Sequence, residues 1–286
     1  MPAVPCAGSA CSALDRLAAS GSDSRWALWR NVLTLIAQRP WTGWGWNELD
    51  YAHYITLFEG PRFSDKLDNA HNLPLHLAVE LGLPLALLIL AALLWMVWRS
   101  RPWAETQAWR QAAWAVLAVI GLHSLLEYPL WYGPFQMALM VCAGSLWLVP
   151  RKSGLSALAH GPQPRGLLDG LALALLLMAS LLAFDYHRVS QIYLSPSQRY
   201  PGYREHPLQH AKATWFFQGH ADFASLSLTP LQPDNAAEQL RLAESLLHYS
   251  PEPLVIERLL DSAAILGDEA KVALHSRRYE AAYPQQ

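Results

Sequence analysis

A histidine between asparagines is the first group in this sequence that could do chemistry. It lies in the run Asp68-Asn69-Ala70-His71-Asn72, directly before a long apolar stretch. An imidazole has an unperturbed pKa of about 6.5, so its neutral form can accept a proton near physiological pH. The side chain of Asp68 or Asn69 could orient the ring. A purely structural explanation also exists, because a polar His-Asn pair can cap the start of a membrane helix.

A second polar group interrupts the apolar part of the chain. His123, Glu127 and Tyr128 lie close together in a region that is otherwise almost without charge. Polar groups at membrane depth are costly and are often functional. At a turn between two helices, however, such side chains can simply reach the lipid headgroups. Both interpretations stay open.

The distribution of charge indicates which elements must position these groups. The 286 residues are 52% hydrophobic and 15% charged, and charge is nearly absent between residues 73 and 184. This pattern predicts a membrane block between two aqueous parts. A net charge of −2 gives no reason to expect nucleic-acid binding. The sequence has no cysteine cluster typical of a metal site, and no cofactor is expected.

Four apolar segments are predicted to cross the membrane, at about residues 73–98, 111–127, 132–149 and 166–184. A helix needs roughly 20 apolar residues to cross a hydrocarbon layer about 30 Å thick. The second and third segments form a hairpin, since prolines and aromatic residues within 127–134 break the helix. A buried core helix is the alternative for each segment, but four in succession leave little polar surface to cover them. The predicted fold class is therefore an all-α membrane protein with about four transmembrane helices and a soluble helical C-terminal region.

The basic residues of the membrane block set its expected orientation. All six lie in the two connections 99–110 and 150–165, and they are Arg99, Arg101, Arg110, Arg151, Lys152 and Arg165. The positive-inside rule places these connections in the cytoplasm. The N-terminal part up to residue 72, the turn at Glu127 and residues 185–286 then face outward.

The N-terminal aqueous part has two sections. Residues 1–24 lack the basic start and apolar run of a signal peptide and are expected to be disordered. Residues 25–72 form a loop, and its first section, 25–38, is amphipathic and could lie at the membrane surface. The expected apolar face consists of Trp26, Trp29, Leu33 and Ile36. An outward-facing part of 72 residues needs a signal peptide or a preceding membrane helix, which favours the C-terminal part of a larger protein over a late start.

The C-terminal aqueous part, residues 185–286, is predicted to be a helical domain. Helical patterns occupy 234–249, 254–266 and 268–283, with Asp234 as the expected N-cap and Gly267 as a stop. Short paired helices of this kind resemble tetratricopeptide-like hairpins, although no fixed repeat is apparent. The domain could be a plain helical cap or a docking surface for a partner or substrate.

Three short motifs occur in order along the chain. The first is Arg25 followed by P-x-x-G-x-G at residues 40–45. The second is His-Asn at 71–72 followed by E-x-G at 80–82, and the third is HSLLEYPLWY at 123–132. Together they resemble the O-antigen ligase and polymerase superfamily. The third motif is similar to the branch that contains bacterial protein O-oligosaccharyltransferases, also described as membrane-bound virulence-factor polymerases.

This resemblance implies a glycosyltransferase of the bacterial inner membrane, with several crossings and its site in the periplasm. Such enzymes take a glycan from an undecaprenyl-pyrophosphate carrier and transfer it to a hydroxyl of a protein, a sugar or a lipid core. Protein Ser/Thr O-glycosylation is the expected reaction, with O-antigen ligation or polymerisation as the alternative. No metal is implied. A non-catalytic membrane scaffold that docks a periplasmic partner is the alternative from another class.

The resemblance also implies roles for individual residues. His71 matches the family's histidine and is expected to act as general base or to orient the acceptor. Arg25 matches the family's loop arginine and is expected to bind pyrophosphate, because a guanidinium donates two parallel hydrogen bonds. Arg39 is a second candidate and Arg62 a weaker one, while an ordinary interfacial anchor is the alternative for Arg25. The expected supporting residues are Asn72, His123, Glu127 and Tyr128.

Family members carry many more membrane helices before this region, and those helices build much of the cavity for the lipid carrier. This chain alone could therefore hold the catalytic loop and yet be inactive.

Overall fold

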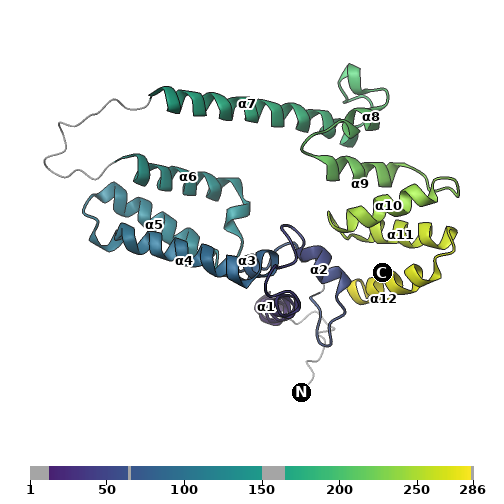
Figure 1. Ribbon diagram of the computed structural model, residues 1–286, viewed down its shortest axis with the longest axis horizontal. Coiled ribbons are helices and arrows are strands. Elements are labelled where there is room, and N and C mark those ends of the chain that lie inside the picture. The colour runs from purple at the N-terminus through teal and green to yellow at the C-terminus, as the bar shows by residue number, and fades with distance from the viewer. Residues whose placement is uncertain (1–12, 64–65, 150–164, 285–286) are drawn as a thin grey trace. The chain divides into compact units, whose positions relative to one another are not determined.

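A computed structural model describes residues 13–63, 66–149 and 165–284, and every regular element in these ranges is helical (Figure 1). The predicted all-α character is confirmed. The chain divides into two compact units, one of residues 1–149 with 277–286 and one of residues 150–276. Each unit is described separately below.

In its described residues, the first unit contains six complete helices. They are α1 (Ala13–Gln38), α2 (Leu49–Ile55), α3 (Leu73–Leu81), α4 (Leu83–Ser100), α5 (Ala108–His123) and α6 (Gly133–Leu148). Short 3₁₀ turns lie at Pro102–Ala104 and Pro129–Trp131.

The second unit begins with α7 (Arg165–Ser190) and continues with α8 (Pro207–Lys212), α9 (Gln218–Leu228), α10 (Ala236–Leu247) and α11 (Pro253–Ile265). Its 3₁₀ turns lie at Gln191–Tyr193 and Pro201–Tyr203. The last helix, α12 (Glu269–Ala282), starts in this unit.

Helix α1 packs against α3 through a face that only partly matches the one predicted. Its fully buried side chains are Leu28, Val32 and Leu35; of the predicted face Ile36 is buried and Trp29 packs against the core, whereas Trp26 and Leu33 are exposed. The helix is therefore part of the core of its unit, and the two exposed side chains remain available to lipid. It begins at Ala13, inside the segment expected to be disordered up to residue 24, and residues 1–12 lie outside the described ranges.

Within the described ranges, two helical stretches are long and apolar enough to cross a membrane, Leu83–Ala104 and Ala172–Tyr193. Few of their side chains are buried in the protein, which argues against soluble core helices. Helices α5 and α6 have 16 residues each, or roughly 24 Å of helix at 1.5 Å per residue. Since that is less than the hydrocarbon thickness of about 30 Å, four complete crossings stay a prediction.

The predicted first crossing, residues 73–98, is interrupted rather than continuous. Gly82 has φ +81° and ends α3, and Pro84 stands in the first turn of α4. A residue with positive φ cannot continue a right-handed helix. The first part of this segment is therefore a separate short helix, α3, which belongs to the core of the first unit.

Helices α5 and α6 form the predicted hairpin, with a turn at residues 124–132. The opposite end of the hairpin is fixed by Arg110, whose Nε donates to Glu105 Oε2 at 2.7 Å. Its Nη1 also donates to the carbonyl oxygen of Val149 at 2.8 Å. Both members of this ion pair are buried, and a buried pair is stable only when its remaining donors are also satisfied.

The two glycine motifs of the sequence meet as backbone against backbone. Trp44 N donates to Val79 O at 2.9 Å, and Gly45 N donates to Glu80 O at 3.0 Å. Leu83 N donates in return to Pro40 O at 2.8 Å. Together these three bonds join the P-x-x-G-x-G loop to the break between α3 and α4, and we call them the backbone clasp.

Only glycine fits the centre of this clasp. Gly43 has φ +68°, and a Cβ there would lie 2.2 Å from Glu80 O. A Cβ on Gly82 would lie 2.4 Å from Trp41 O. Both positions combine a left-handed backbone with close backbone contact, which is where glycine is required.

In the second unit, Asp185 near the end of α7 fixes the segment that precedes α9. Its buried carboxylate accepts from Thr214 Oγ1 at 2.7 Å and from the backbone N–H groups of Trp215 and Phe216 at 2.9 and 2.8 Å. Arg188 Nη2 donates to the other oxygen at 2.5 Å. With these four donors the charge is well compensated despite its burial.

The three predicted C-terminal helices are present as α10, α11 and α12. The N-cap of α10 is Asn235 rather than Asp234, and Gly267 with φ +74° follows α11 as predicted. The contact between α10 and α11 buries Leu246, Val255, Ile256 and Leu259. A tetratricopeptide-like arrangement stays a prediction.

The backbone clasp predicts that Gly43→Ala destabilises the first unit. A non-glycine residue in such a backbone conformation costs about 1–3 kcal/mol, and the contact with Glu80 O adds to this. Thermal unfolding in detergent measures the change. Gly121→Ala in α5 is the control, because a Cβ there meets no heavy atom within 4 Å. Equal melting temperatures for the two variants would contradict the prediction.

Candidate functional site

Three contacts with neighbouring groups fix the backbone around His71. Asn69 Oδ1 accepts from His71 N at 2.9 Å, and Trp29 Nε1 on α1 donates to Ala70 O at 3.1 Å. Asn72 Oδ1 accepts from Leu75 N at 3.0 Å and so caps α3. His71 itself has φ +49°, which is uncommon for a residue other than glycine. The sequence therefore holds the imidazole in one place at the start of α3.

Asn72 also ties this segment to the α5–α6 turn. Its Nδ2 donates to Leu125 O at 2.9 Å, and Leu73 N donates to Ser124 O at 2.8 Å. Two segments more than 50 residues apart are thus joined by direct hydrogen bonds. The turn brings Glu127 and Tyr128 to His71.

Glu127 lies between two cationic or ionisable groups. His71 Nδ1 is 2.9 Å from Glu127 Oε2, and Arg25 Nη2 donates to Glu127 Oε1 at 2.7 Å. Exposed fractions of 47% for Arg25, 33% for Glu127 and 27% for His71 leave all three side chains open to solvent. We call this group the Arg25–Glu127–His71 cluster.

The cluster determines which nitrogen of His71 is the base. A carboxylate only accepts hydrogen bonds, so the contact with Glu127 favours the tautomer with the proton on Nδ1. The lone pair of a neutral ring then lies on Nε2. Glu127 also stabilises the positive charge that forms when Nε2 takes up a proton. This is the relation of base and orienting carboxylate found in general-base sites.

Tyr128 covers one side of the His71 ring. The two rings are edge to face with centroids 4.7 Å apart, and Tyr128 stacks on Tyr132 at 5.4 Å. A hydrogen bond with Tyr132, followed by partial burial, raises the pKa of the Tyr128 phenol to about 12. Tyr128 is therefore neutral at physiological pH and restricts the motion of the imidazole.

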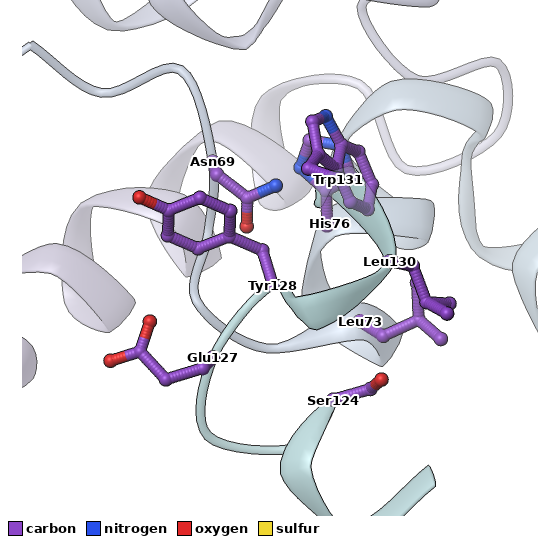
Figure 2. A pocket seen from close by; sticks show the side chains of 8 residues that line it. All are labelled: Asn69, Leu73, His76, Ser124, Glu127, Tyr128, Leu130 and Trp131. Atoms are coloured by element: carbon purple, nitrogen blue, oxygen red, sulfur yellow. The ribbon is translucent and has the colours of Figure 1, made fainter. Parts of the chain in front are cut away.

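A pocket lies beside the cluster, between the start of α3 and the α5–α6 turn (Figure 2). Figure 2 shows Glu127 and Tyr128 on the segment that leads into the 3₁₀ turn Pro129–Trp131, and the ring of Trp131 lies over His76 in this view. The residues that line this pocket are Asn69, Leu73, His76, Ser124, Glu127, Tyr128, Leu130 and Trp131.

Two predicted site residues lie outside the cluster. The guanidinium of Arg39 lies over the ring of Trp44, 4.1 Å from its centroid, next to the backbone clasp. The His123 ring makes an edge-to-face contact with Phe135 at 5.6 Å. The structure thus brings together Arg25, His71, Asn72, Glu127 and Tyr128 of the predicted set.

Arg62, the weaker candidate, belongs to a buried network of the N-terminal loop. Its Nη1 donates to Thr56 O at 2.8 Å and its Nη2 to His53 O at 2.7 Å. His53 Nε2 is 3.3 Å from Asn31 Oδ1, an oxygen that also accepts from Phe63 N. These contacts hold the loop together and leave Arg62 directed inward.

The sequence alone did not reveal how the imidazole is oriented. Asp68 or Asn69 was the expected partner, but Glu127 contacts the ring and Asn69 binds the backbone of His71. Glu127, the only acidic residue between 111 and 149, was expected as a supporting residue but not as the partner of His71. A lone carboxylate at a turn facing an arginine and a histidine indicates an ion pair.

The described residues thus combine two helices suited to the membrane with a histidine–carboxylate–arginine cluster, and the family matches place this chain among membrane-bound polymerases and ligases. Residues 111–286 match the family described as virulence factor membrane-bound polymerase, C-terminal. Because this match covers well over half of the chain, the protein belongs to that family. Residues 8–90 also match the O-antigen ligase family.

One curated relative is the general O-oligosaccharyltransferase of Acinetobacter baylyi. It is 32% identical over 120 residues, which are 42% of this chain and 21% of the relative. The chain thus matches only about a fifth of that protein's length. No solved structure matches the chain.

Asn72 gives a prediction that separates its two hydrogen bonds. Asn72→Ala loses the cap of α3, which is worth about 1 kcal/mol, together with the contact to Leu125 O. Asn72→Asp keeps the capping oxygen and loses only the Nδ2 donor. The expected order of melting temperatures in detergent is wild type, then N72D, then N72A. An N72A protein as stable as the wild type would contradict the assigned cap.

His53 gives a prediction about pH. Burial, with a smaller contribution from Arg62, lowers the pKa of His53 to about 3. In unfolded protein a histidine titrates near 6.5, so the folded form favours neutral His53 and its contribution to stability is lost as pH falls below about 6.5. The ring should stay neutral between pH 7 and 5 by NMR of its carbon-bound protons. Titration of His53 near pH 6 would contradict this.

Proposed function

We propose that the Arg25–Glu127–His71 cluster is the acid–base and leaving-group part of a glycan-transfer site on the periplasmic side of the inner membrane. The donor is a glycan on a polyprenyl pyrophosphate, and the acceptor is a hydroxyl group. The single observation that supports this most is the position of Glu127 between the base candidate and the phosphate-binding candidate.

The proposed reaction uses His71 as general base. Nε2 takes the proton of the acceptor hydroxyl while its oxygen bonds to C1 of the glycan. The bond between C1 and the pyrophosphate oxygen breaks, and the electron pair leaves with the pyrophosphate. Glu127 stabilises the imidazolium that results. General-base assistance of this kind contributes roughly 10²–10⁴-fold to rate.

Arg25 is proposed to bind the leaving pyrophosphate. Among the described residues Arg25 contacts Glu127 through Nη2, which leaves its other N–H donors for phosphate oxygens in this part of the chain. Contact with Glu127 keeps the guanidinium beside the imidazole without removing it from solvent. An exposed pair of this type contributes little to stability, which agrees with a role in binding rather than folding.

Two acceptor classes are supported by different comparisons. The relative named general O-oligosaccharyltransferase favours transfer to protein serine or threonine. The match of residues 8–90 to the O-antigen ligase family favours transfer to lipopolysaccharide. We place protein O-glycosylation first for one reason. The HSLLEYPLWY run resembles the protein O-oligosaccharyltransferase branch, and the same run supplies Glu127 and Tyr128 of the cluster.

The test introduces substitutions into the protein in the bacterium that makes it. His71→Ala and Arg25→Ala should each lower glycan transfer at least about 100-fold, and Arg25→Lys should have an intermediate effect because it keeps charge but loses the planar fork. Glycosylated periplasmic proteins are measured by mass spectrometry, and lipopolysaccharide is measured by gel electrophoresis in the same cells.

His123→Ala is the matched control, since His123 lies at the same turn but contacts Phe135. It should leave transfer within about twofold of wild type. Loss of protein glycans alone in H71A supports O-glycosylation, and loss of long-chain lipopolysaccharide alone supports ligation. Full activity in both H71A and R25A would reject the site and favour a scaffold. Labelling of an Asp68→Cys protein from the cytoplasmic side would reject the orientation.

A further inference from the structure

Exposed aromatic side chains gather at the polar end of α7. Phe184 and Tyr186 on this helix are 52% and 62% exposed, and Trp215 and Phe216 in the segment before α9 are 64% and 48% exposed. Trp215 follows Asp185 by 30 positions, yet it lies beside α7 because the backbone N–H groups of Trp215 and Phe216 bind the Asp185 carboxylate. We call Trp215 and Phe216 the aromatic tip. A patch of exposed aromatic rings marks a surface that contacts a partner.

The aromatic tip is held in one position from both sides. Thr214 Oγ1 donates to the Asp185 carboxylate and accepts from Phe217 N at 3.0 Å, so the residues before and after the tip are fixed as well. Arg188 on α7 places its guanidinium over the ring of Trp215, 5.6 Å from the centroid. The two rings are therefore presented outward by a rigid turn.

The charge pattern of α7 indicates the depth at which the aromatic tip lies. No charged residue stands between Asp169 and Asp185, and few side chains of the apolar stretch Ala172–Tyr193 are buried in the protein. The 16 positions from Asp169 to Asp185 correspond to about 24 Å of helix, which is less than the hydrocarbon thickness of about 30 Å. When α7 crosses a bilayer, Asp185 and the tip bound to it therefore lie at the border between hydrocarbon and headgroups.

The chemistry around Asp185 suits this depth. The residue is 0% exposed, and its four hydrogen-bond donors replace water, so its charge can lie at the edge of the hydrocarbon layer. Tryptophan and tyrosine are enriched at this level of membrane proteins, because their rings are amphipathic. Tyr193 further along the same segment is also 61% exposed. Open rings that continue the exposed apolar surface of α7 fit a phospholipid layer better than a soluble partner.

We propose that Trp215 and Phe216 insert into the phospholipid headgroup layer beside α7 and hold the second unit against the bilayer. Because α9 begins at Gln218, directly after this segment, the helix starts at the membrane surface. The unit is then attached to the membrane both through α7 and through the aromatic tip, which fixes its orientation. This inference goes beyond glycan transfer, since no residue of the Arg25–Glu127–His71 cluster takes part in it.

Spin labelling of the intact protein in phospholipid nanodiscs tests the depth of the aromatic tip. The three cysteines are first replaced by alanine, and Phe216→Cys then carries a nitroxide. Power saturation compares its accessibility to oxygen, which concentrates in lipid, with its accessibility to a water-soluble nickel chelate. The oxygen-to-nickel ratio at residue 216 is expected to approach that of Leu176→Cys, because Leu176 is 67% exposed within the apolar part of α7.

Leu228→Cys is the matched control in water. Leu228 is 59% exposed at the far end of α9, and Figure 1 shows α9 running onward from the polar end of α7. Its oxygen-to-nickel ratio should be several-fold lower than that at residue 216. Asp185→Ala removes the acceptor that holds the tip, so the ratio at residue 216 should fall toward that of Leu228→Cys. Gel filtration in detergent confirms that this variant is folded, and the comparison among residues 176, 216 and 228 does not need it.

Equal ratios at residues 216 and 228 would overturn the proposal, because the tip would then lie in water. A label at residue 216 that neither oxygen nor the nickel chelate reaches would also overturn it, because protein rather than lipid would cover the tip. A water-like ratio at residue 176 would remove its basis, since α7 would not lie in lipid. A lipid-like ratio at residue 216 that falls in Asp185→Ala supports it.

Discussion

Contact between two stretches of backbone, at Gly43 and at Gly82, controls where the elements of the first unit lie. The loop after α1 and the break between α3 and α4 approach so closely that neither position has room for a Cβ. Three backbone hydrogen bonds close this contact. The helix α1, which carries Arg25 in its middle, and the start of α3, which follows His71, are thereby set at fixed positions. The geometry of the site thus depends on residues that have no side chain.

Charge in the site is arranged around one carboxylate. Glu127 contacts an arginine and a histidine that come from two other segments of the chain. Exposed ion pairs hold structures together only weakly, so the positions of these side chains are set by the tethers from Asn69, Asn72 and Trp29. Backbone contacts fix the geometry, and the charged groups remain free to exchange partners.

The sequence was sufficient for the helical fold class, for the hairpin of α5 and α6, and for the last three helices, because hydrophobic pattern and prolines are local signals. It also named Arg25, His71 and Glu127 as candidates through residue type and motif, and the structure places them together. The pairing of His71 with Glu127 spans 56 residues and could not be derived from spacing. The break at Gly82 was missed, since the apolar run continues through it and only the contact with residues 40–45 explains it. The face of α1 that joins the core was identified only in part, because Leu28, Val32 and Leu35 are buried by contacts with other segments that the local apolar pattern does not reveal.

The carboxylate of Asp185 has a mechanical consequence for the second unit. Its bonds to Thr214, Trp215 and Phe216 come from the segment that leads into α9, while Asp185 itself lies on α7. Arg188 strengthens the joint by donating to the Ala213 carbonyl. Because of these bonds, α7 cannot rotate freely relative to α9. Any change in the tilt or rotation of α7 therefore moves the start of α9 with it, because both ends of this joint are bound to the same carboxylate.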